Sequence, residues 1–204
     1  MSSTIKVNNI KNLAGDDSGI DLSTNDQIIL KTANTTAITV NSSQNVAVGS
    51  TLGVTGLITA SAGVAIGGTG SANTLDDYEE GTFTGALEGS TTNPSTAVTV
   101  AGTYTKIGNM CYAQAQFTNV NSTGSAGGVR VTGLPFSASG SQATGNVMTY
   151  VGMTLSTTST NISPYVSGTT ISFYQSTNQA GWSEITHNAG TGTYISFSVF
   201  YKTT

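Results

Sequence analysis

The character of this chain changes near Ala72, and this change constrains the fold more than any other feature. Residues 1–71 carry no Phe, Tyr or Trp and consist mainly of Thr, Ser, Asn, Gly, Val and Ile. Every aromatic residue of the protein follows, beginning with Tyr78. Large aromatic side chains supply much of the apolar area that an ordinary core buries. The first part is therefore predicted to lack a core of its own, and the second part to be a compact domain.

The composition favours β-structure along the whole chain. Charged residues make up only 8%, whereas a typical soluble domain has about 25% and disordered segments are usually rich in charge. Thr, Val and Ile are abundant, and these β-branched residues prefer strands. No stretch has the apolar spacing of an amphipathic helix. We therefore predict an all-β protein with almost no helix.

Composition also excludes several functions. The six Lys and Arg residues are scattered and the net charge is −4, so nucleic-acid binding is not expected. No segment approaches 18 consecutive apolar residues, so membrane insertion is not expected. The single cysteine, Cys111, cannot form an intrachain disulfide, and its alternation with Ala113, Ala115 and Phe117 predicts a buried thiol. No cofactor is expected.

Residues 1–17 are predicted to be a docking segment that becomes ordered against a partner. The segment is short and mostly polar, so it cannot bury enough apolar surface to fold alone. Its apolar contacts would come from Ile5, Val7, Ile10 and Leu13.

Residues 18–74 form a series of short β segments separated by Gly, Asn and Ser. Several of them, such as 36–40 and 45–49, alternate apolar and polar residues. Each segment offers about two small apolar side chains to one face, too little for one chain to offset its loss of entropy. Three chains wound together would bury these side chains and pair the open strand edges. We therefore predict an intertwined trimeric β stalk, with an ordinary sheet edge or a flexible linker as the alternative.

Residues 75–204 are predicted to be a head domain, an antiparallel β-sandwich of jelly-roll-like type, because turn signals recur at the spacing of a sandwich or barrel. The candidate strands are 81–87, 96–100, 102–107, 110–118, 129–134, 146–155, 162–166, 169–175, 182–186 and 193–202. The last strand alternates cleanly, so its even and odd positions face opposite sides. Gly108 and Asn109 are predicted to form a two-residue hairpin turn. The Gly- and Ser-rich stretches 119–128 and 137–146 are predicted to be exposed loops.

Three sequence blocks lie in a fixed order: residues 75–84 (LDDYEEGTFT), 102–109 (GTYTKIGN) and 131–136 (VTGLPF). Together they resemble a module common in tail-fibre and related virion proteins of bacteriophages, especially marine and cyanobacterial phages. The resemblance implies a homotrimeric appendage on the exterior of the virion. It implies that the N-terminus contacts other virion proteins and that the head contacts a glycan or protein of the host surface. It does not imply an enzyme.

Two other functions remain open. The chain could be a structural part that contacts no receptor, such as a head fibre, a decoration protein or a tail-assembly component. It could also degrade surface polysaccharide, in which case His187, the only histidine, or the carboxylates of Glu88 and Glu184 would have to serve. No Gly-x-Ser-x-Gly nucleophile elbow occurs.

The candidate receptor site lies in residues 174–188, which combine the only tryptophan with amide, imidazole and carboxylate groups. An exposed aromatic ring beside amides suits sugar recognition, because CH groups stack on the ring and hydroxyls bond to the amides. The alternative is that the tryptophan is a core or trimer-interface residue. The predicted receptor-binding residues are Tyr174, Asn178, Gln179, Trp182 and His187.

Four carboxylates fall within five residues at the predicted junction of stalk and head: Asp76, Asp77, Glu79 and Glu80. Hard cations such as Ca²⁺ take oxygen ligands of this kind. The spacing does not match an EF-hand, which needs a Gly at its sixth and a Glu at its twelfth position. A solvated junction is favoured, and no metal site is expected.

Overall fold

The computed structural model describes residues 9–11, 19–21, 28–33, 35–68, 70–177 and 181–204. It is all-β, as the composition predicts. Within these ranges there is no α-helix, only a single 3-10 turn at Ser71–Asn73. No helix of the described chain is long and apolar enough to cross a membrane.

The chain divides into two compact units, residues 1–59 and 60–204. The division falls before the predicted boundary at 74/75, because β6 (Val64–Ala65) pairs with β7 (Thr74–Leu75) and ties this stretch to the second unit. Of the predicted docking residues, Ile10 lies in a strand. The other three, Ile5, Val7 and Leu13, lie outside the described residues.

The first unit holds a five-stranded antiparallel sheet in which each strand pairs with the next one along the chain. The strands are β1 (Asn9–Lys11), β2 (Gly19–Asp21), β3 (Ile28–Thr32), β4 (Thr35–Val40) and β5 (Val46–Val48). Residues 52–54 and 56–58, which lie within the predicted series of short β segments, form no strand. None of the residues whose burial is described between 28 and 59 is buried. In this part of the chain the sheet therefore encloses no core.

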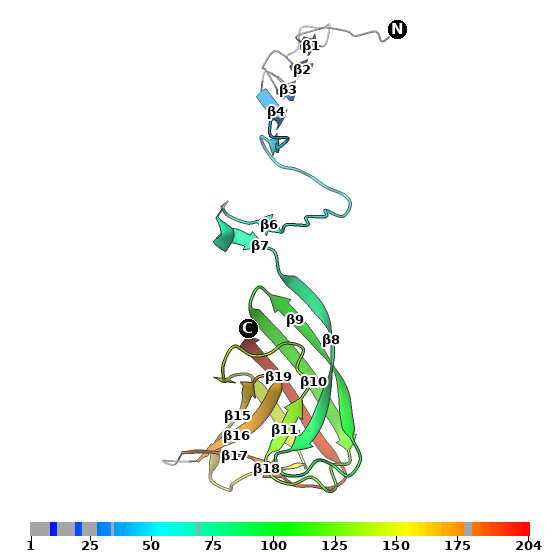
Figure 1. The fold of residues 1–204 in the computed structure, drawn as a ribbon, viewed down its shortest axis with the longest axis vertical. Helices are drawn as coiled ribbons and strands as arrows, with labels where there is room; N and C mark the ends of the chain where they lie inside the picture. Colours follow the sequence, from blue (N-terminus) through cyan, green and yellow to red (C-terminus); the bar gives the residue numbers. More distant parts are fainter. Residues whose placement is uncertain (1–8, 12–18, 22–27, 34, 69, 178–180) are drawn as a thin grey trace. The chain divides into compact units, whose positions relative to one another are not determined.

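The second unit is built on a ten-stranded antiparallel sheet that curls on itself (Figure 1). The strand order across the sheet is β12-β15-β16-β11-β8-β9-β10-β19-β13. Strand β17 pairs with β16 but lies outside this order. The strands are β8 (Tyr78–Gly89), β9 (Val98–Ile107), β10 (Met110–Val120), β11 (Val129–Thr132), β12 (Gln142–Ala143), β13 (Asn146–Tyr150), β15 (Ser159–Ser167), β16 (Thr170–Thr177), β17 (Trp182–Glu184) and β19 (Thr193–Lys202). A small separate pair joins β14 (Met153–Thr154) to β18 (Thr186–His187).

The curl brings the two ends of the sheet together. Strand β12 pairs with β15 at one end and β13 pairs with β19 at the other, although only Thr144 and Gly145 separate them in sequence. Gln142 bridges the gap: its Nε2 donates to the Lys202 carbonyl at 2.9 Å, and its Oε1 accepts from the Lys202 N–H at 2.8 Å. The predicted sandwich of two sheets thus differs from the structure, in which one curled sheet supplies both sides of the core.

Inward-facing side chains of the curled sheet form the core. On β19 the alternation predicted from sequence is confirmed, because Ile195, Phe197, Val199 and Tyr201 are all buried. As predicted, Cys111 is fully buried. It lies opposite Tyr201. Burial raises the pKa of the Cys111 thiol, which keeps it protonated and unreactive.

Two glycines of strands β8 and β9 lie opposite aromatic residues of the neighbouring strand. Gly81 lies opposite Tyr104, and Phe83 lies opposite Gly102. A Cβ added at Gly81 would lie 2.8 Å from the Tyr104 ring, and one added at Gly102 would lie 2.4 Å from the Phe83 ring. Each ring therefore occupies the space that a side chain on the facing strand would need. The prediction of two strands broken near position 101 is wrong, because Gly102 serves ring packing within a continuous β9.

The hairpin between β9 and β10 is confirmed. Ile107 pairs with Met110, so Gly108 and Asn109 alone make the turn. Gly108 has a φ of 55°, a left-handed conformation that glycine adopts without steric cost.

Candidate functional site

Three aromatic rings meet on the outward face of β15, β16 and β17. Tyr165 and Tyr174 come from neighbouring strands, and Trp182 lies on β17 beside β16. The ring centroids of Tyr174 and Trp182 are 4.6 Å apart at 72°. Those of Tyr165 and Tyr174 are 5.5 Å apart at 78°, and those of Tyr165 and Trp182 are 5.9 Å apart at 32°. We call these three residues the aromatic cluster.

The aromatic cluster borders a cleft of about 260 Å³. The lining residues are Ala143, Ser163, Tyr165, Tyr174, Ser176 and Trp182. The Trp182 side chain is 63% exposed, so the core alternative for this residue does not hold in the single chain. The volume of the cleft is slightly below the range of about 300–1,000 Å³ that is typical of ligand sites. An exposed indole beside serine hydroxyls can stack on an apolar ring face while the hydroxyls form hydrogen bonds.

An ion pair lies next to the cluster. The guanidinium of Arg130 and the carboxylate of Glu184 are 3.4 Å apart, and Glu184 is the cross-strand neighbour of Tyr174. Burial raises the pKa of Tyr174, the Glu184 charge adds to this effect, and Arg130 opposes it. The Tyr174 hydroxyl therefore stays protonated at neutral pH and can donate a hydrogen bond. The Glu184 carboxylate fits here because residue 128 is a glycine. A Cβ added at Gly128 would lie 2.0 Å from the Glu184 Cδ.

Of the five residues predicted for receptor binding, the structure brings Tyr174 and Trp182 together. Asn178 and Gln179 lie outside the described residues. His187 belongs to β18 and does not line the cleft. Sequence reasoning missed Tyr165, although its position between Ser163 and Ser167 on the alternating β15 was a usable signal for an outward ring.

The surroundings of His187 favour its neutral form. Its Nε2 lies 2.9 Å from the Glu88 carbonyl, and its Nδ1 is buried without a hydrogen-bond partner. Burial lowers the pKa of His187 from its ordinary 6.5, and the Glu88 carbonyl only partly opposes this. The unfolded chain therefore binds a proton more readily than the folded one. The stabilising contribution of neutral His187 is complete above about pH 6.5 and is lost as the pH falls through the lower folded pKa.

We expect the free energy of unfolding of the native chain to fall more steeply than that of His187→Gln between about pH 7 and pH 5. Glutamine keeps a donor for the Glu88 carbonyl but takes up no proton in this range. Urea denaturation at both pH values measures the difference, and equal falls in the two proteins would contradict it.

Three of the four carboxylates of the predicted junction are engaged by separate partners. Asp77 forms an ion pair with Lys106, and Glu79 accepts a hydrogen bond from Tyr104. Glu80 accepts one from Tyr78. Alternation along β8 points Glu79 and Glu80 to opposite sides of the sheet. Among the residues that the structure describes, no group of three or more His, Cys, Asp and Glu side chains is arranged to hold a metal ion.

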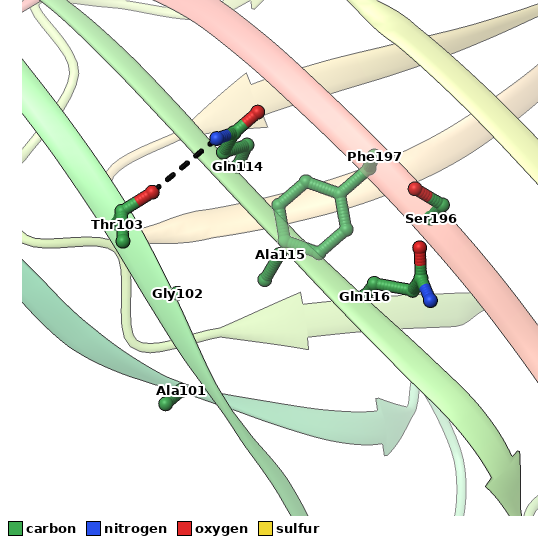
Figure 2. A pocket seen from close by; sticks show the side chains of 8 residues that line it. All are labelled: Ala101, Gly102, Thr103, Gln114, Ala115, Gln116, Ser196 and Phe197. Carbon is green, nitrogen blue, oxygen red and sulfur yellow. Dashed lines mark hydrogen bonds between the residues drawn. The ribbon is translucent and has the colours of Figure 1, made fainter.

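A second hollow, of about 330 Å³, opens where β9 and β10 separate (Figure 2). The ladder between these strands ends at Thr103 and Gln114, after which β9 stays paired with β8 and β10 with β19. Gln114 Nε2 donates to Thr103 Oγ1 at 3.4 Å (Figure 2). The other polar side chains of the hollow are those of Gln116 and Ser196, and no lining residue is ionisable.

No protein-family model matches the chain, and no curated protein matches it.

Proposed function

We propose that the chain is a structural protein of a bacteriophage virion, a homotrimeric tail fibre that attaches the particle to the surface of its host. The resemblance of residues 75–84, 102–109 and 131–136 to phage tail-fibre sequences supports the virion assignment. The observation that carries the attachment role is the aromatic cluster, with its exposed Trp182, at the mouth of a small cleft.

The proposed ligand is a glycan of the host surface. Its apolar ring face would lie on the Trp182 indole, where the negative face of the aromatic ring attracts CH groups. Its hydroxyls would bond to Ser163, Ser176 and the protonated Tyr174 phenol. Tyr and Trp are rigid side chains with few rotatable bonds, so holding a ligand costs them little conformational entropy.

The first unit supports the proposed trimer. In the single chain Leu52, Leu57 and Ile58 are 66%, 93% and 63% exposed, and none of the residues with described burial between 28 and 59 is buried. Short units without a core usually need partner chains. In the proposal, residues 18–74 of three copies wind into a stalk, the N-terminal segment docks on other virion proteins, and residues 75–204 form the head.

The proposal assigns the chain no catalytic role and no cofactor. The imidazole of His187 faces the backbone carbonyl of Glu88, which cannot serve as an acid or base. The carboxylate of Glu184 is paired with Arg130. These contacts support a binding site over a hydrolytic one.

Trp182→Ala is expected to weaken binding of the full chain to an array of bacterial lipopolysaccharide and capsular glycans. Loss of a central aromatic contact typically costs about 2 kcal/mol or more, which corresponds to at least about a 30-fold rise in Kd. Tyr78→Ala is the matched control, because Tyr78 is an aromatic residue that is 56% exposed and does not line the cleft.

Unchanged binding by Trp182→Ala would remove the cleft from the attachment role. Native protein that binds other virion proteins but no glycan or host cell would support the alternative structural role, as a head fibre, decoration protein or tail-assembly component.

A further inference from the structure

We infer that copies of this chain meet in the trimer through the outward face of β9, β10, β19 and β13, which we call the assembly face. This inference rests on the homotrimer of the proposed function and adds the surface that forms it. It is carried by the apolar exposure, the polar chemistry and the size of this face.

Large apolar side chains are exposed across the assembly face. Tyr112 on β10 is 39% exposed and lies opposite Phe200 on β19, which is 52% exposed. At the other end of the face, Tyr150 on β13 is 75% exposed. Met148 and Ile107 are 61% and 54% exposed. These side chains form two groups, one at each end of the face, and exposed apolar groups of this size mark surfaces that another molecule covers.

The centre of the assembly face is polar but uncharged. It holds the hollow of Figure 2, with the side chains of Thr103, Gln114, Gln116 and Ser196. Hydroxyl and amide groups both donate and accept hydrogen bonds, so each can pair with the same group of another copy. A row of carboxylates would instead be repelled by the equivalent carboxylates of another copy. The chain has a net charge of −4, yet none of the acidic residues that the structure describes lies on these four strands, and the charged side chain on the outward side of β19 is Lys202 at its end.

If three copies pack this face around a common axis, the groups nearest the axis meet the same groups of the other two copies, so their chemistry must tolerate its own kind. Within the face, Gln114 is held in position, because its Oε1 accepts from the Tyr112 hydroxyl at 3.0 Å and its Nε2 donates to Thr103. One N–H of this amide is left for a partner. The face is therefore already ordered before a second copy arrives, which lowers the entropy cost of association.

The size of the face fits a contact between copies. Four strands about 4.8 Å apart and eight residue steps of about 3.3 Å along β19 give roughly 500 Å². Three such faces around the trimer axis bury about 1,500 Å² together, which adds to the area buried along the proposed stalk. A sugar unit would cover only the central hollow and leave the apolar ends open to water.

Oxidation of Met148 by hydrogen peroxide tests the assembly face on the intact chain. Light scattering first gives the mass, which is expected near three times 20.7 kDa. Met148 in that trimer is expected to oxidise at least tenfold more slowly than in the same chain unfolded in urea, as followed by peptide mass spectrometry. In a single chain its exposure would give little protection.

Ser196→Asp places a like charge from each copy on the assembly face and is expected to remove the protection of Met148. Asn161→Asp is the matched control, since Asn161 is an exposed residue of β15 outside the assembly face. It adds the same charge and is expected to leave Met148 protected. Circular dichroism confirms that both variants fold.

A native trimer in which Met148 oxidises as fast as in the unfolded chain would overturn the assembly face and leave the proposed trimer standing. Continued protection in a folded Ser196→Asp variant would also overturn it. A monomeric native protein would overturn the trimer and the assembly face together, and would leave glycan binding by the aromatic cluster unaffected.

Discussion

Gly145→Ala is expected to prevent the second unit from closing, with a loss of at least about 4 kcal/mol in the free energy of unfolding. Gly145 has a φ of 101° and lies between β12 and β13, where the chain passes from one end of the curled sheet to the other. An added Cβ would lie 2.0 Å from the Ser198 carbonyl oxygen and 2.8 Å from the Val199 Cα. Both are backbone atoms of β19, which is paired on both sides, and they cannot turn aside as a side chain can.

Gly140→Ala is the control that separates the effect of this steric clash from the effect of backbone strain. Gly140 has a φ of 80°, and an added Cβ there would meet nothing within 4 Å. Its replacement should cost only the left-handed conformation, about 1–2 kcal/mol. Urea denaturation of the two variants measures the difference. A Gly145→Ala protein as stable as Gly140→Ala would show that the contact with β19 does not hold the sheet closed.

Gly102→Ala is the second change with a large expected effect, a loss of about 3 kcal/mol. The new methyl group would lie 2.4 Å from the Phe83 ring and 2.7 Å from the Gln114 carbonyl oxygen. The ring is buried in the core, where a shift would disturb its packing. Overpacking at a sheet centre therefore has to shift either the ring or the strands.

A double-mutant cycle with Phe83→Leu checks this mechanism. The smaller side chain frees part of the space over residue 102, so Gly102→Ala should cost at least about 1 kcal/mol less in that background than in the native chain. Chemical denaturation of all four proteins gives the coupling. An equal cost in both backgrounds would mean that ring packing does not explain the glycine.

Local features of the fold follow from sequence because they depend on near neighbours. The Gly108 and Asn109 hairpin joins two adjacent strands, and its turn chemistry is contained in the turn itself. The buried face of β19 follows from alternation within a single strand. The buried Cys111 follows from the same pattern on β10.

Sheet closure could not be predicted, because it depends on pairings between distant segments. Residues 137–146 have the Gly and Ser content of an exposed loop, yet they include β12 and the turn at Gly145 that joins both ends of the sheet. The predicted strands 96–100 and 102–107 are one strand, β9, in which Gly102 makes room for a ring from β8. In both cases a distant backbone or side chain decides the role of the residue.

The candidate site was predictable in part. Tyr174 and Trp182 lie within one stretch of sequence, and a hairpin of β16 and β17 brings them together. Tyr165 joins them from β15. It is distant from Trp182 in sequence, so its place in the cluster could not be predicted from the stretch around the tryptophan. His187 follows Trp182 by only five positions in the printed sequence, but β18 pairs with β14 and takes it away from the cleft.

The fluorescence of Trp182 tests the central claim most directly, because it is the only tryptophan in the protein and it borders the proposed glycan cleft. The full chain is titrated with the lipopolysaccharide or capsular glycan that binds it on the array. Glycan binding at the aromatic cluster predicts a saturable change of the emission, with a midpoint equal to the Kd from the array. Saturable binding with unchanged emission would contradict the proposal and place the attachment site elsewhere on the protein.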